Sequence, residues 1–152
     1  YFENWDTMWF QIHEMLYIEK GGTDQVASEL AAYNPLIPNG SELVATMMIE
    51  IPDPEKRQKS LAKLGGIEET VTFVINGSAI AAQAEQDVDR TSADGKASSV
   101  HFVHFPFNDA QIEAFSDVHA DLRISVEHSN YRHSAGLLME ARESLGADFL
   151  LR

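Results

Sequence analysis

The sequence predicts an α+β fold with a largely antiparallel sheet, an N-terminal αα-hairpin and further helices packed on the sheet. Strand and helix patterns are mixed without a regular alternation, which argues against a parallel α/β sheet. Asn76-Gly77 joins two strand patterns, and this dipeptide is a strong signal for an antiparallel hairpin. Two helical patterns near the N-terminus are separated only by Gly21-Gly22, which is typical of an αα-hairpin.

The N-terminal segment is expected to form a short strand over residues 1–4 and then a long amphipathic helix. Asn4 or Asp6 can cap this helix, because either side chain can accept a hydrogen bond from an amide of the first turn. Apolar residues recur along it at helical spacing and form a stripe about 120° wide, which predicts a face packed on the core. The members of this stripe are Trp5, Met8, Trp9, Ile12, Met15 and Leu16.

The remaining elements follow from local patterns of apolar residues and from Gly and Pro positions. A second helix is expected over 25–33. Strands are expected over 42–51, 70–75, 78–84, 99–105, 120–128 and 131–138. Helices are expected over 55–64, 109–116 and 138–150. Residues 85–98 lack apolar periodicity and predict a solvated loop. No change in composition divides the chain, so residues 1–152 are expected to form a single domain, with an upstream segment missing because the chain starts at Tyr1.

The composition narrows the classes of function. Eleven basic and 24 acidic residues give a net charge of −13. Such an acidic protein repels phosphate backbones and anionic lipids, so neither nucleic acid nor a membrane is an expected partner. The chain contains no cysteine, which excludes disulfides, thiolate metal sites and cysteine nucleophiles. No secretory signal is visible, and a cytoplasmic location is expected.

Ionisable residues cluster around the start of the first helix. Glu3, Asp6, His13 and Glu14 could share a metal, since a carboxylate near an imidazole can orient it or join it as a ligand. The alternative interpretation is a capping carboxylate beside a histidine at the edge of the core. Asn4 and Gln11 lie in the same segment, and they are further candidate site residues beside these acidic side chains.

Two further groups of histidines lie on strand patterns. His101 and His104 point to opposite faces of one strand, so packing roles are expected for both. His128 and Tyr131 flank a turn, and together with Glu50 they could form an acid–base or metal cluster. A hydrogen-bonded structural group at this hairpin is the alternative. The sequence contains no nucleophile elbow, Walker-type loop or dinucleotide-binding motif, so it leaves open whether the protein is an enzyme.

Several short motifs resemble a bacterial domain-of-unknown-function family, number three-five-zero-one. They are Phe2-Glu3-Asn4, Asp6-Thr7, Gln11-Ile12, Glu14-Met15, Tyr33-Asn34-Pro35-Leu36-Ile37-Pro38, Ala45-Thr46, Ile49-Glu50-Ile51 and Gly66-Ile67, with Phe102, Phe105-Pro106, His128 and Tyr131 beyond them. The resemblance implies an N-terminal segment before Tyr1 and a redox or iron-related context, beside rubrerythrin-like and iron–sulfur proteins. His13 departs from the pattern, which more often has glutamine there.

These observations favour a non-catalytic accessory or interaction protein in a redox or iron-related context, with a redox protein as partner. The alternative is a small metal-binding protein or metalloenzyme with Glu3, Asp6, Glu14 and His128 as ligands. Nitrogen and oxygen ligands would suit iron, manganese or zinc. A homodimer is a further possibility, and an exposed part of the stripe between Trp5 and Leu16 would be its interface.

Overall fold

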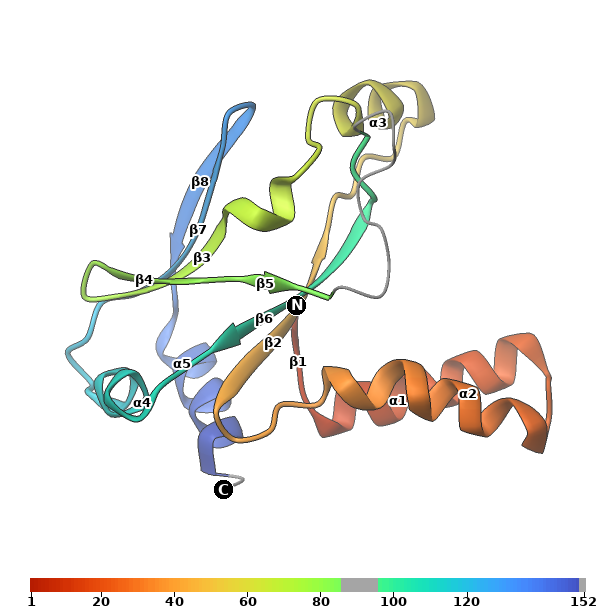
Figure 1. Ribbon diagram of the computed structural model, residues 1–152, viewed down its shortest axis with the longest axis horizontal. Coiled ribbons are helices and arrows are strands. Elements are labelled where there is room, and N and C mark those ends of the chain that lie inside the picture. The colour runs from red at the N-terminus through yellow and green to blue at the C-terminus, as the bar shows by residue number, and fades with distance from the viewer. Residues whose placement is uncertain (86–95, 151–152) are drawn as a thin grey trace.

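Two four-stranded antiparallel sheets form the body of the protein, and a helical hairpin extends from it (Figure 1). The computed structural model describes residues 1–85 and 96–150. Its helices and antiparallel strands confirm the predicted α+β class. The strands divide between two sheets, where the sequence predicted one. Most of the loop predicted over 85–98 lies outside the described residues.

The first sheet has the strand order β1-β2-β6-β5 and the second the order β4-β3-β7-β8. The first contains β1 (Phe2–Glu3), β2 (Glu42–Met48), β6 (Val100–Pro106) and β5 (Gln83–Ala84). The second contains β4 (Ser78–Ala81), β3 (Val71–Ile75), β7 (Leu122–His128) and β8 (Tyr131–Gly136). The strand predicted over 78–84 is therefore divided, because the chain leaves one sheet and enters the other at Ala82.

Tight turns connect the strands of the second sheet. Asn76 and Gly77 both have positive φ, of 50° and 83°, as the mirror-image hairpin turns require. These two residues join β3 to β4, which confirms the predicted hairpin. Ser129 and Asn130 connect β7 to β8, also as predicted.

The main core lies between the sheets and is rich in aromatic side chains. Phe73 is fully buried at its centre, with its ring 5.4 Å from that of Phe107. Phe107 in turn lies 4.9 Å from Phe149, which the C-terminal helical segment contributes. That segment consists of α5 (Met139–Gly146) and the 3-10 helix η3 (Ala147–Leu150), and α4 (Asp109–Ser116) adds Phe115 to the same core.

The helical hairpin consists of α1 (Trp5–Glu19) and α2 (Thr23–Tyr33), followed by the 3-10 helix η1 (Asn34–Leu36). The side chain of Asn4 caps α1 by accepting from the amide of Thr7 at 2.9 Å, and the Thr7 hydroxyl accepts from the amide of Asn4 at 2.9 Å. Only the base of the hairpin packs on the body, where Met8, Leu36 and Val44 form a small core. In Figure 1 the rest of the hairpin projects away from both sheets.

The remaining helices lie between β2 and β3. α3 (Pro54–Leu61) is shorter than predicted and is capped by Asp53, whose side chain accepts from the amide of Lys56. The 3-10 helix η2 (Ile67–Thr70) leads into β3. No helix in the part of the chain that the structure describes has the length and apolar character needed to cross a membrane.

Candidate functional site

An exposed row of aromatic side chains runs along α1. It consists of Trp5, Trp9, Phe10, His13 and Tyr17, and we call it the aromatic face. The indole rings of Trp5 and Trp9 stack at 6.3 Å, and the imidazole of His13 lies 4.0 Å from the ring of Trp9. The Nδ1–H of His13 donates to the backbone carbonyl of Trp9 at 2.8 Å, so its ring is held against the helix.

The aromatic face corrects the predicted core stripe. Met8 and Ile12 are buried as predicted, whereas Trp5 is 58 % exposed and Trp9 is 50 % exposed. The reason is that the hairpin projects beyond the sheet, so α1 buries only the narrow strip that meets α2 and the outer face of β2. Phe10 and Tyr17 are exposed too, at 60 % and 77 %. Large aromatic side chains that remain exposed in a row mark an interaction surface more often than a solvated one.

A second feature is a cavity of about 260 Å³ with mixed polar and apolar walls at the base of the hairpin. The carboxylate of Glu3 lies in it and is only 8 % exposed. One of its oxygens accepts from the hydroxyl of Thr7 at 2.6 Å, and the other accepts from the hydroxyl of Thr46. Gln11 and Tyr33 line the same cavity. The structure thus brings together two of the predicted site residues, Glu3 and Gln11, and places Glu3 in a hydrogen-bonded structural role.

The imidazole of His128 is hydrogen-bonded on both sides at the β7–β8 turn. Its Nε2–H donates to the carbonyl of Gly65 at 3.2 Å, and its Nδ1 accepts from the amide of Asn130 at 3.2 Å. The Asn130 side chain also donates to the carbonyl of Lys63 at 2.7 Å. His128 and Asn130 therefore fasten the β7–β8 turn to residues 63–65, which is the structural alternative that the sequence left open.

Glu50 and Tyr131 lie on the wall of a cleft of about 540 Å³ between β2, α3 and the β7–β8 turn. Its other walls are mainly apolar, with Met47, Ile49 and Leu64 among them. Glu50 also borders a neighbouring cavity of about 310 Å³ between the two sheets. His128 is not among the residues that line this cleft, so the predicted cluster of His128, Tyr131 and Glu50 is not assembled around one cavity.

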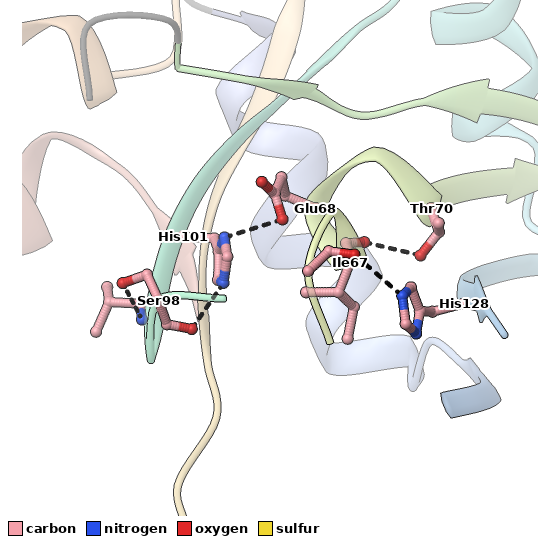
Figure 2. A network of polar contacts seen from close by, with 8 residues as sticks. Ile67, Glu68, Thr70, Ser98, His101 and His128 are labelled. Atoms are coloured by element: carbon pink, nitrogen blue, oxygen red, sulfur yellow. Dashed lines mark hydrogen bonds and ion pairs between the residues drawn. The ribbon is translucent and has the colours of Figure 1, made fainter. Parts of the chain in front are cut away.

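The sequence analysis missed a buried ionisable pair. His101 on β6 is fully buried, and its Nδ1 lies 3.4 Å from a carboxylate oxygen of Glu68 on η2, as Figure 2 shows. The Nε2–H of His101 donates to the carbonyl of Ser98 at 2.9 Å. Nothing in the sequence distinguishes Glu68 from Glu69, which is exposed, so the pairing could be found only from the structure. On the other face of β6, the Nδ1 of His104 lies 3.0 Å from Glu42.

The predicted metal ligands are not gathered at one place. Glu3 is buried under α1, whereas Asp6 and Glu14 are exposed on that helix and His128 lies at the β7–β8 turn. Within residues 1–85 and 96–150, no group of three or more His, Asp or Glu side chains is placed to hold a metal ion. The predicted metal site therefore receives no support from the arrangement of these side chains.

The protein is an α+β protein with two antiparallel sheets, a projecting helical hairpin and an exposed aromatic face on that hairpin. The chain belongs to the family described as "Protein of unknown function (DUF3501)", whose match covers residues 1–149 and confirms the resemblance drawn from the short motifs. It is similar to a solved structure described as a novel protein of unknown function from Burkholderia pseudomallei K96243. The two chains are 37 % identical with a TM-score of 0.86, and the match covers 97 % of this chain and 77 % of that one. No curated protein matches this chain.

Proposed function

We propose that this chain is a non-catalytic, cytoplasmic interaction protein that binds another polypeptide through the aromatic face of α1. The observation that supports this is the exposure of four large side chains, Trp5, Trp9, Phe10 and Tyr17, on a hairpin that projects from the body (Figure 1). Trp and Tyr are the residue types that most often dominate binding energy at protein interfaces.

The hairpin is suited to this role by its construction. Met8 and Leu36 pack against Val44 and attach the base of the hairpin to the first sheet, and the capping box at Asn4 completes the first turn of α1, so the aromatic face lies on a regular helix anchored at its base. The stacked rings of Trp5, Trp9 and His13 are partly ordered before binding. Less side-chain entropy is then lost when a partner covers them.

The redox and iron-related context is part of this proposal on the strength of the family resemblance alone. It makes an iron-containing redox protein the first heterologous partner to test. Electron transfer by this chain itself is not proposed.

Site-specific photo-crosslinking in the native host cell tests the proposal. A photoreactive phenylalanine analogue at Tyr17 is expected to cross-link to a polypeptide that mass spectrometry identifies. The same analogue at Val118, an exposed residue between α4 and β7, is the control. With the identified partner purified, Trp9→Ala should weaken binding by tenfold or more. Equal, weak cross-linking from both positions would contradict the proposal.

A further inference from the structure

The aromatic face carries two charged residues, one at each end of α1. At 3.6 residues per turn, Asp6, Trp9, His13 and Tyr17 project within an arc of about 80°, and the backbone of the C-cap residue Lys20 continues on the same side of the helix. Asp6 lies in the first turn, and Lys20 ends the helix with φ 56°. Both side chains are exposed, and neither forms an ion pair with another described residue.

Asp6 and Lys20 cannot pair with each other within one chain. They are separated by about 21 Å along the helix axis, at 1.5 Å per residue. The other acidic residues of α1 lie outside this arc, with Glu14 beside Phe10 at the edge of the aromatic face. Glu19 accepts from the side chain of Gln25 on α2 at 2.7 Å, and Glu14 projects about 100° from His13 around the helix. The arc itself therefore carries one charge of each sign, although the whole chain carries a net charge of −13.

We propose that two copies of this chain associate through their aromatic faces, with the two α1 helices antiparallel and related by a twofold axis at His13. In this arrangement Asp6 of each copy faces Lys20 of the partner subunit, because the two residues lie at equal distances in sequence on either side of His13. Trp9 of each copy likewise faces Tyr17 of the partner subunit. The contact is self-complementary, as a twofold interface requires.

The opposite charges of Asp6 and Lys20 favour a second copy of this chain as the partner. A basic partner would bring a positive charge close to Lys20. It also fixes the register. If the twofold axis lay between Trp9 and His13, Asp6 would face the half-buried Leu16 of the partner subunit and its charge would have no counterpart. This inference rests on the proposed function, since it names the polypeptide that covers the aromatic face.

Charge reversal tests the pairing by sedimentation equilibrium on the purified full chain. The wild type is expected to sediment as a dimer. Asp6→Lys places two lysines opposite each other at both ends of the interface, and Lys20→Glu places two carboxylates there. Each single variant should therefore raise the dimer dissociation constant about tenfold or more. The double variant D6K/K20E should restore the wild-type constant, since it re-forms both ion pairs with exchanged signs.

Two further variants guard against a general loss of structure. Glu14→Lys makes the same change in charge as Asp6→Lys on the same helix but outside the arc that meets the partner subunit, and it should leave the dissociation constant within about twofold. His13→Lys places two positive charges at the twofold axis and should weaken the dimer. The circular dichroism spectrum of every variant should match that of the wild type.

A wild type that stays monomeric overturns the inference, and so does a double variant no tighter than the single ones. The failure of the two proposals can be distinguished. A monomer whose Tyr17 position cross-links to a different protein refutes the second copy and leaves the interaction function standing. If Tyr17 cross-links to nothing in the cell, the interaction function fails as well.

Discussion

His101 and Glu68 are buried side chains in contact, and a double-mutant cycle can measure how strongly they interact. Removing one partner of a buried polar pair takes away part of what offsets the desolvation of the other, which costs about 1–3 kcal/mol. We therefore expect Glu68→Leu and His101→Leu each to lower the free energy of unfolding by this amount. The double variant should lose clearly less free energy of unfolding than the two single variants lose together. Urea unfolding of the four proteins measures this coupling, and additive losses would contradict it.

A second residue gives the stability of this protein a dependence on pH. Burial raises the pKa of the Asp148 carboxyl in η3 above its usual range. The folded state therefore favours the protonated form. Protonation of Asp148 thus adds to the free energy of unfolding. This gain is fully present below the pKa of an unfolded aspartate, about 3.9, and is lost as the pH rises through the pKa of the folded state.

Asp148→Asn should remove the cost of ionising this carboxyl, so it is expected to raise Tm at pH 7 and to leave Tm unchanged near pH 3. Thermal unfolding followed by circular dichroism measures both. Asp117→Asn, at an exposed aspartate, is the control and should shift Tm little at either pH. An equal gain for Asp148→Asn at both pH values would show that ionisation is not the cause.

At the residue scale, the sequence identified ionisable residues of interest but not their partners. Glu3 was predicted as a site residue, and its burial under α1 depends on the two hydroxyls of Thr7 and Thr46. Thr46 is distant in sequence and meets Glu3 only because β1 pairs with β2. Glu68 was missed for the same reason, since its partner His101 comes from another strand. Local patterns carry no information about such contacts.

At the element scale, the turn between α1 and α2 requires a glycine at position 22 because of its backbone conformation. Gly22 has φ 68° and ψ −153°, a region that is essentially restricted to glycine. Gly22→Ala is therefore expected to cost about 1–3 kcal/mol and to destabilise the hairpin. Chemical denaturation gives the loss, and amide exchange in residues 5–33 locates it.

Gly66 provides a control in another turn. It has φ 75° and ψ 13°, a left-handed conformation that non-glycine residues adopt at lower cost. Gly66→Asn should therefore be tolerated better than Gly22→Ala. Uniform destabilisation by Gly22→Ala, without faster exchange in the hairpin, would contradict a local role for this turn.

Helices and turns were the elements that the sequence predicted best. The cap at Asn4 and the turn at Asn76-Gly77 are local features, and both are confirmed. The burial of α1 was predicted wrongly because periodicity shows which residues share a face and not what covers that face. Trp5 and Trp9 share a side of the helix that the body does not reach.

At the scale of the whole molecule, the division of the strands between two sheets could not be predicted from the sequence. The pattern over 78–84 is continuous, but β4 pairs with β3 and β5 pairs with β6. The amide of Ala82 donates to the carbonyl of Val71 at 2.9 Å, which fixes the point where the chain changes sheet. Sheet membership depends on pairing between distant strands, and a single sequence does not specify that pairing.

The arrangement of β1 and β2 leads to a prediction for a chain extended upstream of Tyr1. The amide of Thr46 donates to the carbonyl of Tyr1 at 2.8 Å, and the amide of Ile49 donates to that of Ser99, just before β6. Backbone groups alternate between the two sides of a strand, so the amide of Met48 points to the side of β1, beyond its first residue. Antiparallel pairing would bring added residues alongside Met47 and Met48, into the cavity between the sheets.

We therefore expect that in an extended chain the residues before Tyr1 lengthen β1 along β2. The amide of Met48 should then exchange with deuterium at least tenfold more slowly than in the present chain, because it gains a hydrogen-bond acceptor. The amide of Ile49 is the internal control, since its bond to Ser99 is present in both chains. Amide exchange followed by NMR measures both residues. If the extension slowed neither amide, or slowed both equally, it would not be pairing with the free edge of β2.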